Sequence, residues 1–110
     1  MKKIYSNILE IKDNFDAFFL DAGGVFYKGS ELYNNAKETM KELKRNGKKL
    51  IVVSNATKIE SKIVEHYAKN GLNRGEHYDE VITSGETLRD TLVNNKTIFE
   101  NKKNARNVYV

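Results

Sequence analysis

An apolar run that ends in a single carboxylate and opens into a Gly-Gly loop sets the strongest limit on the fold. The stretch covers residues 15–29 and reads FDAFFLDAGGVFYKG. The run is too short to span a membrane and is apolar on both faces, so it predicts a buried strand of a parallel sheet. Reactive groups in such sheets lie just beyond the carboxyl ends of the strands, which makes Asp21 a candidate reactive group.

Length and composition indicate that residues 1–110 form one globular domain or part of one. Apolar residues make up 39% of the 110 residues and charged residues 31%, a balance typical of a chain with a core of moderate size. The net charge of +4 is spread over several segments, so we expect no nucleic-acid partner. Cysteine is absent, which excludes disulfides, thiolate catalysis and cysteine-ligated metals.

The N-terminus does not resemble a targeting segment. Polar and charged residues interrupt MKKIYSNILEIKDN before a signal-peptide core forms. Nothing in the chain approaches the roughly 18 apolar residues that a membrane span needs. We therefore expect a cytoplasmic protein without a membrane partner.

Apolar spacing and helix-end signals predict four helices. The first is a short amphipathic helix over residues 4–11. Capping pairs open the other three: Asn35 with Glu38, Thr57 with Glu60, and Thr83 with Glu86. Their apolar faces carry Ala36, Met40 and Leu43; Ile59, Ile63 and Tyr67; and Leu88 and Leu92. Gly47 and Gly71 are expected to end the second and third helices in a left-handed conformation.

Strands are predicted over residues 16–20, 49–53 and 78–83, so strand, loop and capped helix repeat along the chain. This order predicts an α/β fold: a three-layer α/β/α sandwich with a parallel Rossmann-like sheet, right-handed crossovers and helices on both faces. A fourth strand is expected over residues 107–110. In the loop over residues 21–33, Phe26 and Tyr27 either form a small flap or cover the core edge, and the sequence leaves both open.

Polar residues follow two of the predicted strands, Asp21 after the first and Ser54-Asn55 after the second. If these strands are neighbours, the residues face one crevice, where a carboxylate can act as a covalent nucleophile. Ser54 and Asn55 can donate hydrogen bonds to a phosphate near the positive end of the following helix. Gly23 and Gly24 let backbone amides approach an anion. The combination favours phosphoryl transfer, although each residue is also common in turns or at helix starts.

The two histidines and three of the tyrosines give weaker signals. His66 and His77 have no second ligand at metal spacing, so we expect ordinary surface roles for both. Tyr67, Tyr78 and Tyr109 are expected to pack in the interior and not to stack on a ligand.

Two strings resemble the haloacid dehalogenase-like (HAD) phosphatases. FFLDAGGVFYKG is similar to their first motif, and IVVSNAT is similar to their second. YDEVITSGET and the later VYV are similar to the class IIA branch, in which a cap domain is inserted after the second motif. The resemblance covers nearly the whole chain and implies an incomplete HAD-like core: its N-terminal part, without the cap and the C-terminal core motifs.

The resemblance implies a role for each matching residue. Asp21 would attack a small phosphorylated metabolite and form an aspartyl-phosphate. Ser54 would bind the phosphate, and Asn55 would order the loop or the substrate. Asp21 and the backbone carbonyl of Gly23 would hold a magnesium ion.

Two departures from the family pattern limit the expected activity. Gly23 stands where most family phosphatases have a second Asp, whose acid–base role is worth roughly 10²–10⁴ in rate. The family's Lys motif and acidic metal motif follow the cap, so the magnesium site would be incomplete. We expect a truncated phosphohydrolase with weak or no independent activity. The alternatives are a non-catalytic remnant or oligomerising module that associates through an exposed sheet edge, and a flavodoxin-like signalling or nucleotide-binding domain, although no phosphate-loop fingerprint is present.

Overall fold

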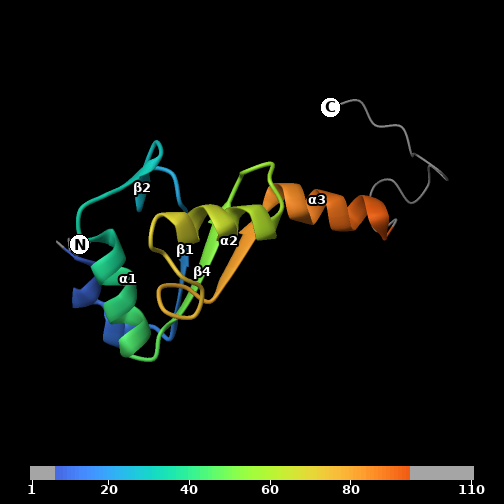
Figure 1. Cartoon of the computed structure of the whole chain (residues 1–110). Helices are drawn as coiled ribbons and strands as arrows, with labels where there is room; N and C mark the ends of the chain where they lie inside the picture. The colour runs from blue at the N-terminus through green and yellow to red at the C-terminus, as the bar shows by residue number, and fades with distance from the viewer. Residues whose placement is uncertain (1–6, 95–110) are drawn as a thin grey trace.

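A computed structural model describes residues 7–94 of the chain as a small parallel sheet with helices (Figure 1). The sheet has three strands in the order β1-β4-β5: β1 (Ala17–Leu20), β4 (Lys49–Ser54) and β5 (Glu80–Thr83). The helices are α1 (Ala36–Arg45), α2 (Glu60–Lys69) and α3 (Ser84–Val93). Two 3₁₀ turns, η1 (Ile8–Glu10) and η2 (Lys12–Asn14), precede the sheet, and a hairpin of β2 (Tyr27–Lys28) and β3 (Glu31–Leu32) follows β1.

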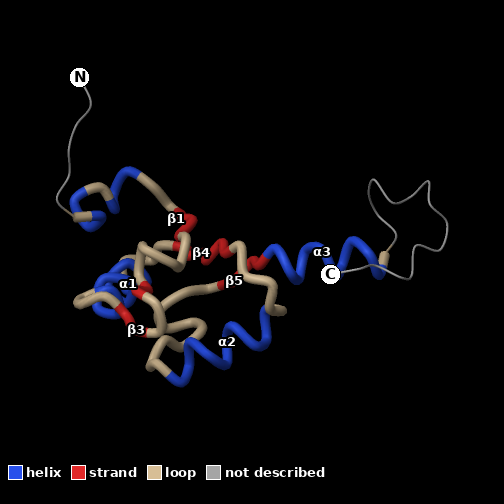
Figure 2. The backbone as a smooth tube through the Cα atoms, turned by 90° about the horizontal axis from the view of Figure 1, so that it is seen from above, coloured by secondary structure: helices blue, strands red, loops and turns tan. Residues whose placement is uncertain are grey.

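The strand pairing confirms the predicted parallel α/β fold. β4 pairs in parallel with β1 on one side and with β5 on the other. Leu20 is level with Val52, and Ser54 is level with Thr83, so the carboxyl ends of all three strands lie at one edge of the sheet. The helices α1 and α2, which connect these strands, lie on the same face of the sheet (Figure 2). The fourth strand predicted over residues 107–110, including Tyr109, lies outside the described residues.

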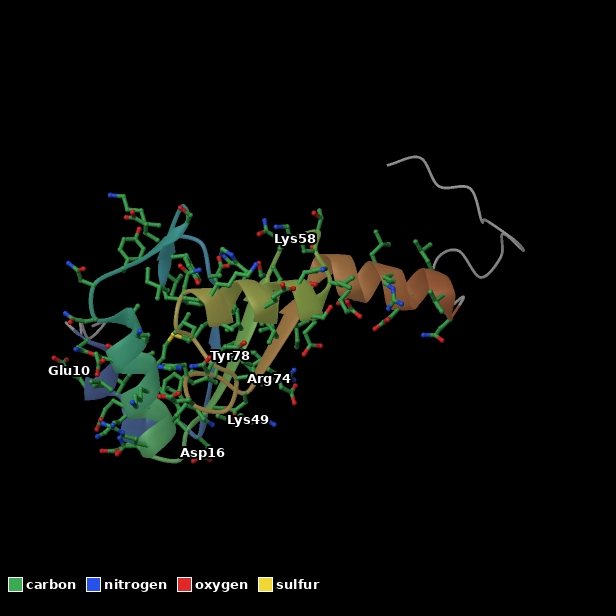
Figure 3. All side chains as sticks on the ribbon, in the orientation of Figure 1. Glu10, Asp16, Lys49, Lys58, Arg74 and Tyr78 are labelled. Atoms are coloured by element: carbon green, nitrogen blue, oxygen red, sulfur yellow. The ribbon has the colours of Figure 1, made fainter. Side chains whose placement is uncertain are left out.

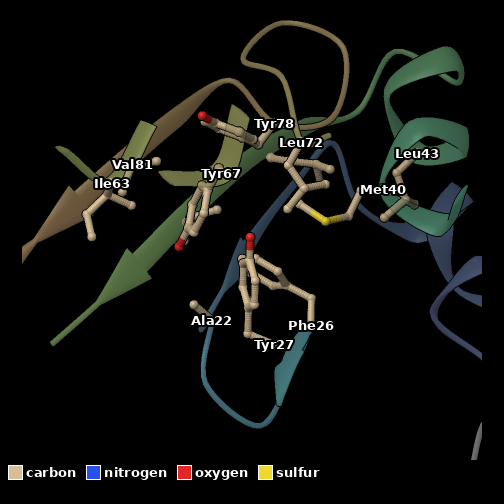
Figure 4. Close-up of a cluster of buried hydrophobic side chains, with 12 residues drawn as sticks. Ala22, Phe26, Tyr27, Met40, Leu43, Ile63, Tyr67, Leu72, Tyr78 and Val81 are labelled. Carbon is tan, nitrogen blue, oxygen red and sulfur yellow. The ribbon is translucent and has the colours of Figure 1, made fainter. Parts of the chain in front are cut away.

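The core lies between the sheet and these two helices (Figure 4). The three-stranded sheet contributes Leu50, Val52 and Val81 to this core, and the two helices contribute Met40, Leu43, Ile63 and Tyr67. Tyr78, just before β5, is completely buried, and Tyr67 is 4% exposed. The predicted packing roles of these two tyrosines are therefore confirmed.

The opposite face of the sheet carries exposed apolar side chains. Phe19 is 70% exposed, Ile82 45% and Val53 41%. The strands are thus buried toward α1 and α2 only, so the burial on both faces that we predicted for the first strand is wrong at Phe19. The reason is that the described helices α1 and α2 cover one face, and α3 leads away from the end of β5 (Figure 1).

The segment predicted as an amphipathic helix over residues 4–11 forms one 3₁₀ turn, η1, in its described part. The side-chain oxygen of Asn7 accepts a hydrogen bond from the Leu9 amide at 2.9 Å. Such local bonds compete with α-helical hydrogen bonding, so the helix prediction is wrong for residues 7–11. The part of the segment that contains Ile4 lies outside the described residues.

The start of α1 differs in detail from the capping prediction. Asn35 occupies the N-cap position, but its φ is 66° and its side chain forms no capping hydrogen bond. A capping side chain normally reaches the amides of the first turn from an extended backbone, so the predicted capping box with Glu38 is wrong. The predicted left-handed glycines are confirmed: φ is 75° at Gly47 and 82° at Gly71.

The start of α2 also differs from the prediction, whereas the start of α3 agrees with it. Ile59 is the N-cap residue of α2 and supplies no side-chain hydrogen bond, so the predicted cap by Thr57 is wrong. At α3, the Thr83 hydroxyl accepts a hydrogen bond from the Glu86 amide at 3.1 Å, as predicted.

Candidate functional site

The carboxyl ends of the three strands border one open cavity of about 710 Å³. Its polar lining residues are Asp21, Ser54, Asn55, Thr83, Ser84 and Thr87, and its apolar lining residues are Phe19, Leu20, Val53 and Ile82. The structure therefore brings together three of the predicted site residues, Asp21, Ser54 and Asn55. Figure 3 shows the two ends of the sheet. Asp16 and Lys49 lie at the amino ends of β1 and β4, and Lys58 lies in the loop after the carboxyl end of β4.

Asp21 is exposed to solvent at the end of β1. Its Oδ1 atom accepts a hydrogen bond from the amide of Ala22 at 2.8 Å, which fixes the side chain against its own backbone. Within residues 7–94, its Oδ2 atom accepts no hydrogen bond, so one carboxylate oxygen is available for attack on an electrophile.

Gly23 and Gly24 lie in the turn after Asp21 and do not line the cavity. The Gly24 amide donates to the Tyr27 carbonyl at 2.8 Å, and the φ of Gly24 is 80°. This amide therefore closes the turn, and only glycine adopts such a backbone readily. In the described part of the chain, the Gly23 amide has no acceptor, so it is the one of the two that an anion could use.

Aromatic packing holds the turn in place. Phe26 and Tyr27 are 3% and 5% exposed, so the interpretation in which they cover the core is confirmed. The Tyr27 ring stacks on that of Tyr67 in α2, with the centroids 5.4 Å apart and an interplanar angle of 21°. Both Phe26 and Tyr27 also donate backbone hydrogen bonds to the Ala22 carbonyl, at 3.1 and 3.0 Å. The residue that follows Asp21 is thus tied to the core.

Tyr67 is not available as a base near Asp21. Burial, and then the neighbouring Tyr27, Tyr78 and Asp21, raises the pKa of Tyr67 to about 12. A phenol of ordinary pKa, about 10, is already neutral at neutral pH, and this shift makes Tyr67 still harder to ionise. Its ring supports the turn by stacking on Tyr27.

Ser54 ends β4, the strand that pairs with β1, and Asn55 follows it. The Ser54 hydroxyl oxygen accepts a hydrogen bond from the Ala56 amide at 3.2 Å, which leaves its proton for donation to a ligand. Asn55 is exposed. The positive end of α2 does not serve this site as expected, because the Glu60 amide donates to the carboxylate of Glu86 at 3.1 Å.

Sequence reasoning missed the contribution of α3. Ser84 and Thr87, in the first turn of this helix, line the same cavity as Asp21. The available signal was the position of the TSGET string, since Thr83 ends β5 just as Asp21 and Ser54 mark the ends of β1 and β4. The Ser84 hydroxyl is held by the Ala56 carbonyl at 3.2 Å, and that of Thr87 by the Thr83 carbonyl at 3.0 Å.

The predicted magnesium ligands are partly suited to that ion. The Asp21 carboxylate and the Gly23 carbonyl are oxygen donors of the kind that magnesium prefers. Among residues 7–94, no group of three or more acidic or histidine side chains is arranged to hold a metal. A magnesium ion bound by Asp21 and Gly23 would therefore have to take its remaining ligands from substrate phosphate and water.

The two histidines have different surroundings. His66 is exposed and stacks against Tyr27, with the ring centroids 5.7 Å apart, which agrees with a surface role. His77 is only 3% exposed, and its Nδ1 atom accepts a hydrogen bond from the Asn73 amide at 3.0 Å. The prediction of a surface role for His77 is therefore wrong, because this ring closes the turn before β5.

No helix found in residues 7–94 has the length and apolar character needed to cross a membrane.

Comparisons with known proteins agree with the fold and the motifs. Residues 18–110 match the family model described as haloacid dehalogenase-like hydrolase. Phosphoglycolate phosphatases 1A and 1B, chloroplastic, of Arabidopsis thaliana are each 32% identical over 71 residues, which cover 64% of this chain and 20% of theirs. The crystal structure of a hydrolase of the haloacid dehalogenase-like family from Brucella suis 1330 aligns with a TM-score of 0.74 and 25% identity, over 83% of this chain and 33% of that one. The chain thus spans about a fifth of the length of the curated relatives.

Proposed function

Because the chain belongs to the haloacid dehalogenase-like hydrolase family, we propose that it supports hydrolysis of a small phosphate ester through an aspartyl-phosphate. The observation that carries the proposal is the convergence of Asp21, Ser54 and Asn55 on one cavity at the carboxyl ends of the strands. A nucleophilic carboxylate opposite hydrogen-bond donors is the arrangement that phosphoryl transfer needs.

Each side chain has a specific part in the proposed reaction. An Asp21 oxygen attacks phosphorus, and the bond from phosphorus to the ester oxygen breaks, so that the leaving group departs as an alkoxide or phenolate and takes its proton from water. The Ser54 hydroxyl and the Asn55 amide donate to the phosphoryl oxygens, where negative charge must be stabilised. Water then hydrolyses the aspartyl-phosphate and regenerates Asp21.

The metal and the acid–base group set the expected rate. Asp21 and the Gly23 carbonyl would hold magnesium, which supplies charge neutralisation at the phosphate when it is bound. Gly23 offers no carboxyl group to protonate the leaving alcohol or to activate water, a loss of roughly 10²–10⁴ in rate. We therefore expect weak turnover, with activated aryl esters favoured because their leaving groups need no proton.

Hydrolysis of p-nitrophenyl phosphate with magnesium tests the proposal. Asp21→Asn should reduce turnover to the level of buffer, because an amide does not replace the carboxylate as nucleophile. Asp16→Asn is the matched control, since Asp16 is exposed at the other end of the same strand; it should keep the wild-type rate. Equal turnover by wild type and Asp21→Asn would contradict the assignment.

A second candidate function, association with another copy of the chain, is supported by the exposed apolar face of the sheet. Phe19, Val53 and Ile82 form this face, and all three also line the cavity that contains Asp21. Association through this face would therefore cover the proposed site, so the two functions compete.

Sedimentation velocity over a range of protein concentrations distinguishes the two candidates. If the face mediates association, Phe19→Ser should shift the equilibrium toward monomer. Val25→Ser, which removes an apolar side chain that is 53% exposed in the loop after β1, should not. A monomer at all concentrations would exclude association and leave the catalytic proposal in place.

A further inference from the structure

We propose that residues 83–86, the N-cap and first three residues of α3, are a positioning element for Ser54 and Asn55; we name this element the α3 clamp. The inference rests on the proposed function, because it assigns these residues a part in the same site. The clamp is formed by hydrogen bonds between the junction of β5 with α3 and the loop that joins β4 to α2.

Three clamp residues bind backbone carbonyls of that loop. The Gly85 amide and the Ser84 hydroxyl both donate to the Ala56 carbonyl, at 3.1 and 3.2 Å. The Thr83 hydroxyl donates to the Lys58 carbonyl at 2.8 Å. Two carbonyls two residues apart are therefore fixed to a helix that begins more than 20 positions later in the chain.

Glu86 joins the starts of two helices. Its own amide donates to the Thr83 hydroxyl, and its Oε2 atom accepts from the Glu60 amide at 3.1 Å. Since α2 has no side-chain cap of its own, Glu86 supplies the acceptor that its first turn would otherwise lack. A carboxylate at a helix start is also favoured by the helix dipole.

The loop depends on these hydrogen bonds because none of the side chains of residues 55–59 is buried. Ala56 connects the clamp to Ser54. Its carbonyl is held by the clamp, and its amide donates to the Ser54 hydroxyl oxygen at 3.2 Å. A displacement of the clamp would thus turn the Ser54 hydroxyl away from the position in which it can donate to a phosphate.

The test compares Glu86→Ala and Glu86→Gln in the full chain. Hydrogen exchange should accelerate about tenfold or more at the Glu60 amide in Glu86→Ala, since a hydrogen bond to a charged acceptor is lost. Glu86→Gln retains an oxygen acceptor, so the exchange rate of the Glu60 amide in this variant should stay close to that of wild type. Glu65→Ala is the control, because among residues 7–94 Glu65 forms only exposed ion pairs on α2, with Lys62 and Lys69.

The second readout is binding of inorganic phosphate in the presence of magnesium, followed by amide NMR shifts of Ser54 and Asn55. Glu86→Ala should weaken this binding several-fold, and Glu86→Gln should restore it. Unchanged exchange in Glu86→Ala, or acceleration spread equally over β1, β4 and β5, would overturn the clamp. If Glu86→Ala accelerates hydrogen exchange selectively at the Glu60 amide but the wild-type protein binds no phosphate, the result would support the clamp and contradict the proposed function.

Discussion

Replacement of Gly85 by alanine should destabilise the fold, although alanine is the better helix former. Gly85 is the second residue of α3, where it meets the loop between β4 and α2. A Cβ atom at this position would lie 2.0 Å from the carbonyl oxygen of Thr57 and 2.4 Å from its carbon. These atoms belong to the backbone, so no side-chain rotation relieves the overlap.

The expected magnitude follows from the contacts that must change. The loop would have to move by about 1.4 Å to restore ordinary contact at Gly85, which would break the two hydrogen bonds to the Ala56 carbonyl at 3.1 and 3.2 Å. Their loss costs about 2 kcal/mol together, and overpacking costs about 1–3 kcal/mol. The helix propensity of alanine offsets about 1 kcal/mol. The net loss is about 2–4 kcal/mol.

Urea denaturation of wild type and Gly85→Ala measures this loss directly. A loss of this size should also lower the melting temperature by about 10 °C or more. Ser61→Ala is the matched control, because Ser61 is the second residue of α2 and is exposed. Its stability should stay within about 0.5 kcal/mol of wild type.

A Gly85→Ala variant as stable as wild type, or more stable, would show that a Cβ at this position causes no steric overlap. It would mean that α3 does not approach the Thr57 backbone closely in the folded protein. The α3 clamp would then lose its geometric basis, since the same approach brings Gly85 and Ser84 to Ala56.

Two further predictions concern charge. A Cβ at Gly23 meets nothing within 4 Å, so Gly23→Asp should fit and raise aryl phosphate turnover by roughly 10²-fold or more. The isosteric Gly23→Asn variant is the control and should not raise turnover. Equal rates for the two variants would exclude an acid–base effect. Burial raises the pKa of Asp79, but hydrogen bonds from Lys44 and the Leu50 amide outweigh burial and hold this pKa below its ordinary value of 3.8. The resulting stabilisation is complete above the unfolded-state pKa of about 3.9 and is lost as pH falls through the lower folded-state pKa. Urea titrations from about pH 5 to about pH 2 should show a smaller loss of stability in Asp79→Asn; an unchanged pH profile would contradict this assignment.

Local sequence patterns predicted the helices and strands of the fold because these elements depend on interactions between residues close together in the chain. The apolar runs that end at Leu20 and Val53 both form strands, and the glycines at positions 47 and 71 adopt the left-handed conformation that ends a helix. Thr83 caps α3 because its hydroxyl and the amide that it binds are three residues apart. The strand ends then place Asp21 beside Ser54 without further information.

Features that depend on contacts between distant residues could not be predicted in this way. Thr57 has the sequence context of a cap, yet the amide of Glu60 is bound by Glu86, which is 26 positions away. Gly85 resembles any residue of a helix start until its distance to Thr57 is known. The exposure of Phe19 likewise depends on which face the helices cover, and an apolar run does not contain that information.

Detection of a phosphorylated Asp21 would establish this residue as the nucleophile. Because Gly23 cannot activate water, hydrolysis of the intermediate should be slow, and the aspartyl-phosphate should accumulate with p-nitrophenyl phosphate and magnesium. After an acid quench and proteolysis, mass spectrometry should find one phosphoryl group on the peptide that contains Asp21, and none in Asp21→Asn. A phosphoryl group on any other residue, or release of p-nitrophenol with Asp21 unmodified at all times, would contradict the account.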